Sequence, residues 1–542
     1  MSGSPGDRHG QGERKSLFHF AYHRSPDQEA ATPVRHPVLV VGAGPVGLSA
    51  AIDLALRGLP VVVLDDADRI GEGSRAICFA KRTLEIWDRL GVAAPMVEKG
   101  VTWKLGKVFF RDQMVYQFDL LPEDGHKMPA FINLQQYYAE HALVSRAEAL
   151  PNLEIRWLNR VGNVRPLDHG VRVDIETPDG PYAIEADWLV AADGARSSVR
   201  RCLGLEFVGQ AFEDHFLIAD VKMQADYPTE RWFWFEPPFH TGQSALLHRQ
   251  PENVWRIDLQ LGPEADPDEE KRPERVIPRL KRMLGDRRFE LEWVSVYMFQ
   301  CRRLERFVHG RVIFAGDAAH LVSPFGARGA NSGVQDAENL AWKLALVLRG
   351  EAPDSLLETY DLERTAAADE NIGHSMRSTE FIAPRSPTEH LFRNAVLDLA
   401  RRTEFAKRMV NSGRLSTAST YTTPLSTPDE DDWGGQARLG APLPDAPVTD
   451  ARGEPHWLLN RLSPGFNLLY VKDGARPNVP AGVALVVIGE DLRDETGHFT
   501  RRFDARPGSA YLVRPDQHLA ARFRTLDRAK VEAALARAMG RG

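Results

Sequence analysis

The sequence predicts an α/β fold in which a parallel sheet flanked by helices is interrupted by an antiparallel sheet and followed by a smaller C-terminal domain. Three observations support this. Residues 37–42, PVLVVG, form the continuous β-branched run of a strand buried on both faces, and a glycine-rich turn and a helical pattern follow. Two later apolar runs, 187–193 and 310–317, each end at an aspartate beside a glycine. Between them, residues 254–261 alternate apolar and polar side chains, the period of a half-buried antiparallel strand.

Composition excludes several classes of protein. The 542 residues are 26% charged and 43% hydrophobic, which is typical of a globular protein of two to four domains. A net formal charge of −7 gives no electrostatic footprint for nucleic acid or for an anionic membrane, so neither partner is expected. The three cysteines, Cys78, Cys202 and Cys301, form no CxxC pair and no zinc-ligand spacing, so neither a disulfide scaffold nor a metal site is expected.

The chain also has clear compositional boundaries. Residues 1–35 are polar, broken by Gly and Pro, and lack a secretory apolar core. No apolar run approaches the roughly 20 residues that cross a bilayer, so a cytoplasmic protein is expected. The expected organisation is a flexible N-terminal arm (1–35), the first part of the α/β domain (36–206), an inserted sheet domain (207–304), the second part with its helices (305–413), a Ser-, Thr-, Pro- and Gly-rich linker (414–455) and a final domain (456–542). In the final domain, short apolar runs predict strands at 466–471, 483–488 and 510–513, and a closing helix is expected from Arg528.

The first motif lies between two predicted strands. Gly42, Gly44 and Gly47 form GxGxxG, with Pro45 at the start of the helix, and Asp65 ends the second strand. In a Rossmann-type unit the first glycine allows a tight turn, the second lets pyrophosphate approach the backbone, and the third permits close helix packing. The aspartate is placed to accept hydrogen bonds from a ribose. These residues predict a dinucleotide site without deciding between NAD and FAD.

Two further segments favour FAD. ADGARSSVR (192–200) and GDAAHLVSPFGARGANSG (316–333) resemble the second and third fingerprints of the flavoprotein aromatic hydroxylases, the single-component FAD monooxygenases. With GxGxxG, the matches occur in order over residues 37–350. YLVRPDQHLAAR (511–522) resembles the thioredoxin-like tail of the phenol hydroxylase branch, which includes hydroxyphenylpropionate hydroxylase, and the C-terminal domain of this chain contains no cysteine. The resemblance implies a Rossmann-type FAD-binding domain, an inserted antiparallel β-sheet substrate domain and a C-terminal thioredoxin-like domain.

The third segment contains groups that suit a flavin on physical grounds alone. Asp317, beside Gly316 at a strand end, can accept a hydrogen bond from a ribityl hydroxyl. Gly329, Ala330 and Asn331 open a long predicted helix, whose free N–H groups and partial positive charge suit the negative charge of a reduced flavin.

The resemblance adds residues by motif. It places Pro324 along the isoalloxazine and Asp193 near the pyrophosphate and the path of the nicotinamide cofactor. It also implies FAD contacts for Arg75, in the SRA run, and for Gln136, in the QxxxExxL helix. Arg328 stands where many relatives have Gln or Gly, and His320 is interpreted as a packing residue of the motif.

The inserted sheet is rich in aromatic residues, and an apolar substrate cavity over the flavin is expected there. Tyr297, Trp234 and His215 are the candidates for its lining. Because a phenol ionises near pH 10, a proton-accepting group is also expected. The sequence does not identify it among His215, His240, His248 and Tyr297.

The resemblance implies a monooxygenase that hydroxylates a phenolic or related aromatic substrate with O₂ and NADPH or NADH, through a flavin C4a-hydroperoxide. No second GxGxxG occurs, so the nicotinamide cofactor is expected to bind transiently. A homodimer is compatible with this interpretation. Two alternatives stay open: a flavin-dependent halogenase, because WFWFEP (232–237) partly matches WxWxIP, and a non-catalytic FAD-fold binding protein.

Overall fold

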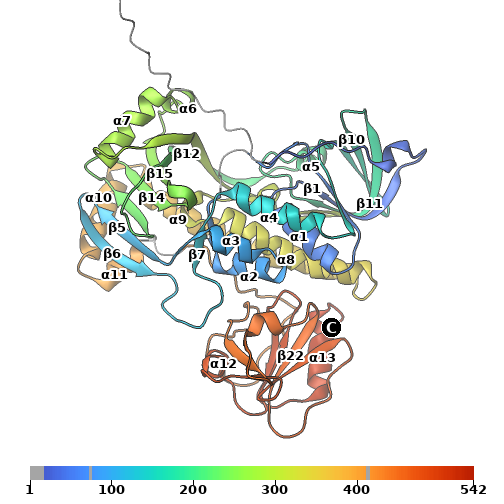
Figure 1. The fold of residues 1–542 in the computed structure, drawn as a ribbon. Coiled ribbons are helices and arrows are strands. Elements are labelled where there is room, and N and C mark those ends of the chain that lie inside the picture. The colour runs from blue at the N-terminus through green and yellow to red at the C-terminus, as the bar shows by residue number, and fades with distance from the viewer. Residues whose placement is uncertain (1–17, 72–75, 411–414) are drawn as a thin grey trace, which may run out of the picture.

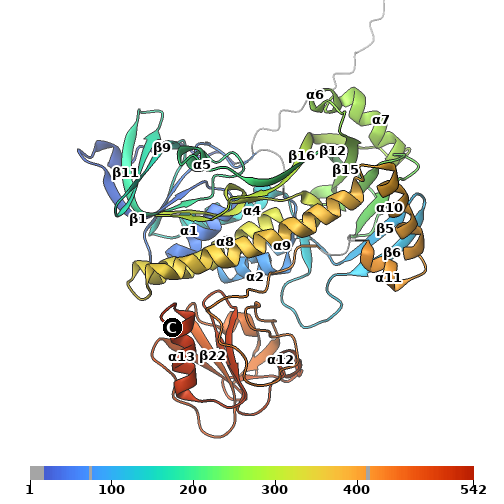
Figure 2. The same ribbon diagram turned by 180° about the vertical axis from the view of Figure 1, so that it is seen from behind.

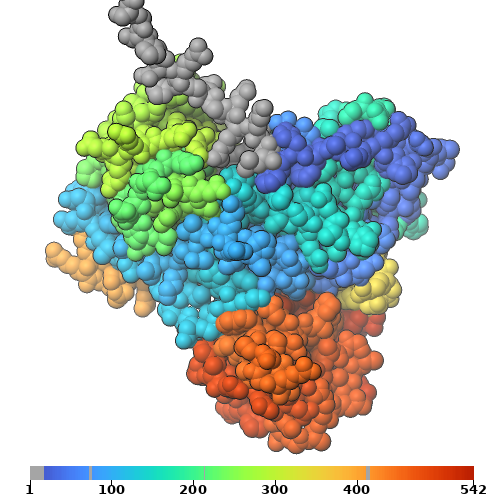
Figure 3. All heavy atoms as spheres, viewed as in Figure 1, coloured from blue at the N-terminus to red at the C-terminus, as the bar shows by residue number. Residues whose placement is uncertain are grey.

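The computed structural model describes residues 18–71, 76–410 and 415–542. Figure 1 shows three lobes: a layered α/β lobe, a sheet lobe beside it, and a C-terminal lobe below both. The surface view in Figure 3 shows the C-terminal lobe as a protruding knob. No helix in the described ranges is long and apolar enough to cross a membrane. The same ranges contain no group of His, Cys, Asp and Glu side chains that could hold a metal ion.

The α/β lobe is built on the predicted strand–turn–helix–strand unit. The β-branched runs pair in parallel because both faces of this sheet are covered, and Val38, Val40 and Val63 are fully buried. Helix α1 (Pro45–Leu56) packs against α8 (Gly329–Leu348) and α4 (Gln136–Glu148). The sheet order is β17 (Val308–His309), β18 (Val312–Phe314), β11 (Tyr182–Ala191), β1 (Val34–Val41), β2 (Val61–Leu64) and β8 (Leu153–Arg156), with β10 (Gly170–Glu176) and β9 (Arg160–Leu167) extending from β11.

The second sheet contains more of the chain than the predicted range 207–304. Strands β5 and β6 join it at one edge, although they come from residues 105–119, and β5 pairs in parallel with β13. Its order is β19 (His320–Leu321), β16 (Glu290–Arg303), β12 (Val208–Lys222), β15 (Val254–Gly262), β14 (Ser244–Arg249), β13 (Arg231–Phe235), β5 (Leu105–Phe110) and β6 (Gln113–Asp119).

Helices and a small sheet connect these two lobes. Figure 2 shows α9 (Glu358–Ile382) running from the α/β lobe to the sheet lobe, where α10 (Pro387–Ala400) and α11 (Glu404–Met409) follow. Strands β3, β7 and β4 form a separate three-stranded sheet, in that order. The remaining elements before residue 410 are β3 (Cys78–Ala80), β4 (Val101–Trp103), β7 (Phe131–Asn133), α2 (Lys81–Arg89), α3 (Ala93–Lys99), α5 (Ser198–Cys202), α6 (Pro267–Glu270) and α7 (Pro273–Leu284).

The C-terminal lobe matches its predicted elements closely. Strands β22 (Phe466–Val471), β23 (Val483–Ile488) and β25 (Ala510–Val513) and the start of α13 (Arg528–Ala538) coincide with the predicted bounds, because each is a short apolar run between turn residues. One strand, β20, lies inside the range predicted as a linker. The other elements are β20 (Pro447–Asp450), β21 (Pro455–Trp457), β24 (Leu492–Arg493), α12 (His498–Phe503) and β26 (Leu519–Phe523).

Part of the predicted arm is attached to the α/β lobe. Phe20 stacks on Trp157 with ring centroids 4.3 Å apart, and the Tyr22 hydroxyl donates to Thr177 at 3.1 Å. These contacts hold the stretch before β1 against the connections that follow β8 and β10. The first 17 residues of the arm lie outside the described part of the chain.

Candidate functional site

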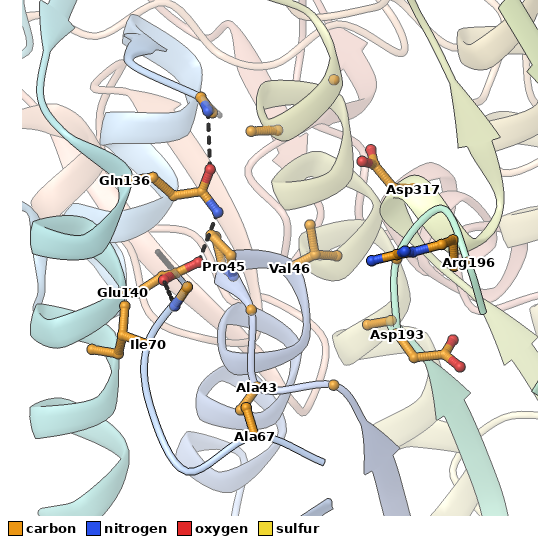
Figure 4. A pocket seen from close by; sticks show the side chains of 18 of the residues that line it. Ala43, Pro45, Val46, Ala67, Ile70, Gln136, Glu140, Asp193, Arg196 and Asp317 are labelled. Carbon is orange, nitrogen blue, oxygen red and sulfur yellow. Dashed lines mark hydrogen bonds between the residues drawn. The ribbon is translucent and has the colours of Figure 1, made fainter. Parts of the chain in front are cut away.

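Three segments that are far apart in the sequence line one cavity of about 730 Å³. They are the β1–α1 turn, the loop after β11 and the loop that leads into α8. In Figure 4, Gln136 and Glu140 stand on one side of the β1–α1 turn, and Asp193, Arg196 and Asp317 stand on the other. The cavity continues to the sheet lobe, whose strands β12, β14 and β15 contribute part of its wall.

The β1–α1 turn has the shape that a dinucleotide requires. Gly42 has φ +105°, and a Cβ there would lie 2.5 Å from the Ala192 carbonyl oxygen. A Cβ at Gly47 would lie 1.9 Å from the Gly42 carbonyl oxygen. At Gly44 a Cβ would meet nothing within 4 Å, and this residue caps α1 without any side-chain hydrogen bond. The first helical turn therefore presents uncapped N–H groups to the cavity, which fits a pyrophosphate.

Asp65 fixes this turn from the end of β2. Its carboxylate accepts the Ala43 N–H at 2.6 Å and the Ala67 N–H at 2.9 Å. Burial raises the pKa of Asp65, against the opposing effect of these two hydrogen bonds. The residue lines the cavity, as the proposed ribose contact requires.

The loop after β11 contributes an acid and a base. Asp193 lines the cavity, but its Oδ2 accepts the N–H groups of Ser198 at 2.7 Å and Val199 at 3.1 Å, so it also caps α5. Its Oδ1 is buried without a hydrogen-bond partner. Arg196 extends from the same loop toward the β1–α1 turn (Figure 4). Its guanidinium suits a pyrophosphate, a role that the motif alone did not single out.

The third segment brings Asp317, Pro324, Gly329, Ala330 and Asn331 to the cavity wall. Asp317 is exposed there. The N-terminus of α8 has no side-chain cap, so its N–H groups face the same space. The Asn331 side chain has a structural role, because it accepts the Ala80 N–H at 2.8 Å and donates to the carbonyl oxygens of Cys78 and Ala327 at 2.9 and 2.6 Å. It ties β3 to the start of α8.

Two predicted motif glycines allow close packing next to the cavity but do not line it. Gly47 and Gly316 are not among the lining residues. A Cβ at Gly316 would lie 2.9 Å from the Val46 side chain, so this glycine allows the third segment to approach α1 closely. His320 is fully buried and its Nε2 lies 2.7 Å from Asp336, in keeping with a packing role.

Gln136 reaches the cavity from the start of α4. Its Oε1 accepts the Ala76 N–H at 2.9 Å and its Nε2 donates to Glu140 at 2.7 Å. The helix therefore braces the segment that precedes β3. Arg75, the other residue assigned by this motif, lies outside the described residues.

The sheet wall differs from the apolar lining that the sequence predicts. Ile218, His248, Arg256 and Asp258 line the cavity, and three of these four are polar. Tyr297, Trp234 and His215 are not among the lining residues. Their surroundings are those of packing: Trp234 stacks on Phe109 at 5.2 Å, Tyr297 lies 6.4 Å from Trp293, and His215 Nδ1 lies 3.3 Å from the Gly262 carbonyl oxygen. An aromatic pocket does exist nearby, lined by Phe233, Phe235, Phe325 and Phe381, but its volume is only about 20 Å³.

Sequence reasoning overlooked Arg256 and Asp258 because they occupy the polar positions of an alternating strand. Such a face usually meets water, yet here Arg256 is 3% exposed. The sequence holds only a hint, a charged residue, Asp220, inside the apolar run 216–221. The structure places Asp220 opposite Arg256, and its carboxylate accepts from the guanidinium at 2.9 Å. An oppositely charged pair at the same face of two strands is what burial of that face requires.

Known proteins with similar sequences or structures bind FAD or are monooxygenases or hydroxylases. The FAD binding domain family matches residues 35–375. The 6-methylpretetramide 4-monooxygenase of Streptomyces rimosus is 32% identical over 524 residues, covering 90% of this chain and 90% of that protein. A probable NADH-specific resorcinol 4-hydroxylase of Rhodococcus jostii (strain RHA1) is 28% identical over 501 residues, covering 89% and 91%. The structure of the flavin-dependent monooxygenase PieE in complex with FAD and substrate has the same fold, with a TM-score of 0.79 at 24% identity and coverage of 94% and 100%.

Proposed function

The chain belongs to the FAD binding domain family and is an FAD-dependent aromatic monooxygenase, and from this premise we propose that it hydroxylates a phenolic ring with NAD(P)H and O₂. One observation carries the proposal: a single cavity joins the three flavin motifs to the polar wall of the sheet lobe. FAD, when bound, takes a hydride from the nicotinamide and activates O₂ for transfer of one oxygen atom. The chain supplies position, charge and exclusion of water.

We infer how the cofactor is held from the donors in the cavity wall. The uncapped N-terminus of α1 and Arg196 would hold the pyrophosphate, and Asp65 would accept from the adenosine ribose. Asp317 would accept from the ribityl chain. Pro324 and the N-terminus of α8 would lie against the flavin ring and favour its reduced, negatively charged form. NADH and NADPH both remain candidates for the reductant.

A halogenase fits less well than a hydroxylase. The residues of the WFWFEP segment are engaged in packing: Trp232 and Trp234 contact each other edge-to-face at 5.7 Å, and the Glu236 carboxylate accepts from Asn394 at 3.1 Å. The relatives named above are a monooxygenase and a hydroxylase. A non-catalytic binding protein would have no need of a cavity that continues beyond the flavin motifs to a second lobe.

Oxygen uptake with a panel of phenols tests the proposal. The FAD-loaded protein is expected to oxidise NADH or NADPH faster with a suitable phenol, and to form a product that carries one atom from ¹⁸O₂. Omission of halide should not change the yield. Reductant oxidation that ignores every phenol, or a halide-dependent product, would contradict the hydroxylase.

We also propose finer features that rest on sequence resemblance. The C-terminal lobe would be thioredoxin-like, an interpretation supported by the parallel β22–β23 pair and the antiparallel β22–β25–β26 strands. Without cysteine after residue 301 it would serve structure rather than thiol exchange. A cytoplasmic location and a homodimer complete the proposal.

A further inference from the structure

The sheet wall of the cavity holds a set of polar side chains that no flavin motif explains. In strand register, Asp220, Arg256 and His248 lie opposite one another across β12, β15 and β14. Asp258 stands two residues further along β15 than Arg256. Side chains two apart in a strand, and side chains directly opposite, share one face of a sheet. All four side chains therefore point to the same side, where the cavity lies.

Most hydrogen-bonding groups of this set are used within the protein. The Arg256 guanidinium donates to both oxygens of Asp220 at 2.9 Å, and Gln250 donates to the same carboxylate at 3.0 Å. Arg231, from β13, donates to His248 Nε2 at 3.4 Å and to the Phe325 carbonyl oxygen at 3.1 Å.

Two atoms of the residues of this set that line the cavity are exceptions. Oδ1 of Asp258 and Nδ1 of His248 are buried and have no hydrogen-bond partner. A buried polar atom without a partner is unfavourable, and few occur in native proteins. Both residues line the cavity, so a bound molecule can supply the missing partners.

The hydrogen-bond pattern also assigns the histidine proton. An arginine can only donate, so His248 Nε2 must be the acceptor and Nδ1 carries the hydrogen. Burial, together with Arg231 and Arg256, holds the pKa of His248 well below its usual value, so the ring is neutral. The cavity therefore offers one acceptor, from Asp258, and one N–H donor, from His248.

We propose that Asp258 accepts the proton of a phenolic hydroxyl of the substrate and that the Nδ1–H of His248 donates to a second oxygen of the same molecule. This rests on the proposed function. The O–H bond breaks, its electron pair stays on the phenolate oxygen, and the proton goes to Oδ1 of Asp258. The phenolate directs electron density into the ring that receives oxygen. Diagonal neighbours on adjacent strands lie about 7–8 Å apart, which suits an aromatic ring with two oxygen substituents.

The acid–base properties of Asp258 agree with this role. Burial raises its pKa to about 7, although Arg256 and Arg231 oppose the shift while Asp220 adds to it. A base whose pKa lies near the working pH is the most effective. Neither His248 nor Cys78 titrates near this pH, since the pKa of His248 lies well below its usual value and burial raises the pKa of the Cys78 thiol to about 12.

The test compares Asp258→Asn and His248→Leu with Glu264→Gln, an exposed carboxylate outside the cavity that loses the same charge. The probes are resorcinol, with two hydroxyls, and phenol, with one. FAD content and the rate of flavin reduction by NAD(P)H without a phenol are measured first, and hydroxylation by each variant is expressed relative to them. Affinity for each probe is then read from the flavin fluorescence without reductant, and hydroxylation from product formation, both across pH 5–9.

We expect wild-type hydroxylation to rise with pH and level off near 7. Asp258→Asn should abolish this inflection and lower kcat by roughly 10²–10⁴-fold. The fall in kcat should be smaller for phenols of lower pKa, because these phenols ionise without a base. His248→Leu should raise KM for resorcinol up to about tenfold and leave that for phenol nearly unchanged. Glu264→Gln should behave as the wild type.

The outcomes separate the two proposals. Turnover by Asp258→Asn with an unchanged inflection would overturn the role of Asp258 and leave the hydroxylase intact. Probe affinity that shows the inflection in the wild type alone, without any hydroxylation, would support Asp258 and refute the proposed function. If His248→Leu changed KM for resorcinol and KM for phenol equally, the proposal that His248 binds a second oxygen of the substrate would be refuted.

Discussion

The carboxylate of Asp336, in the second turn of α8, accepts the backbone N–H of Gly316 at 2.8 Å. The same carboxylate accepts a hydrogen bond from Arg364 Nε at 2.6 Å, and its Oδ2 lies 2.7 Å from His320 Nε2. All of these groups are buried. The end of strand β18, where the third flavin motif begins, is thus fixed by a buried ionic cluster that joins α8, whose first turn lines the cavity, to Arg364 of α9.

Asp336→Asn should therefore affect both stability and FAD binding. The substitution keeps the shape but leaves Arg364 without its carboxylate, and removing one partner of a buried pair costs about 3–5 kcal/mol. Urea unfolding of the FAD-free protein checks this value. Arg35→Gln, which removes an exposed partner of Asp187, is the control and should change the free energy of unfolding by less than about 1 kcal/mol. Equal stabilities for the two variants would refute the role of the cluster.

Asp317→Ala should weaken FAD binding without destabilising the fold. The side chain is exposed in the cavity wall, so its loss removes a contact to the cofactor rather than core packing. A hydrogen bond that involves a charged group is worth about 1.5–3 kcal/mol, or roughly 10- to 150-fold in Kd. Titration of the FAD-free protein with FAD measures it, with the exposed Asp112→Ala as control. Unchanged affinity would contradict the assignment.

Alanine substitutions at Gly47 and Gly44 in the β1–α1 turn should affect different properties, the first stability and the second FAD affinity. Gly47→Ala places a Cβ 1.9 Å from the Gly42 carbonyl oxygen, so the backbone must shift and the FAD-free protein should lose stability. Gly44→Ala meets nothing within 4 Å and has φ −76°, so the fold should keep its Tm. Its new methyl group would occupy the space proposed for the pyrophosphate, so FAD affinity should fall. Thermal unfolding and FAD titration distinguish these results, and identical behaviour of the two variants would refute the argument.

The C-terminal lobe should loosen in acid. Arg514 donates to Glu363 of α9 at 2.8 and 3.0 Å, and Lys343 of α8 donates at 2.8 Å. Burial raises the pKa of Glu363, but Arg514 and Lys343 outweigh it and hold the pKa below its usual value. A carboxylate with a lowered pKa adds stability above its unfolded value, about 4.5, and loses that stability as pH falls toward the folded pKa.

Thermal unfolding from pH 7 to pH 3 checks this expectation. The wild type should lose Tm below about pH 4.5 more steeply than Glu363→Gln, which lacks the titrating group but starts from lower stability at pH 7. Glu351→Gln, an exposed pair partner of Arg349, serves as control and should follow the wild-type slope. Parallel curves for wild type and Glu363→Gln would refute the linkage.

The sequence by itself determined the local elements. Continuous β-branched runs predicted β1 and β2, the glycine spacing predicted the turn between them, and short apolar runs gave the bounds of β22, β23 and β25. These features depend on neighbouring residues, so hydrophobic period and turn chemistry are enough to find them. Among the motif residues that line the cavity, Asp65 and Asp317 follow strands and Gly329 opens a helix, so local patterns pointed to them. Gln136, Asp193 and Pro324 were assigned only through the resemblance to the flavoprotein hydroxylases.

Only the tertiary structure decided what covers each face. Period-two alternation shows that Arg256 and Asp258 share a side of β15, but it cannot show whether that side meets water or another lobe. The fold places the flavin motifs across from it, and this burial raises the pKa of Asp258 and leaves its Oδ1 unpaired. For the same reason the aromatic residues Trp234 and Tyr297 became packing residues. Which side of a strand is enclosed depends on contacts between segments hundreds of residues apart, and no local pattern records those contacts.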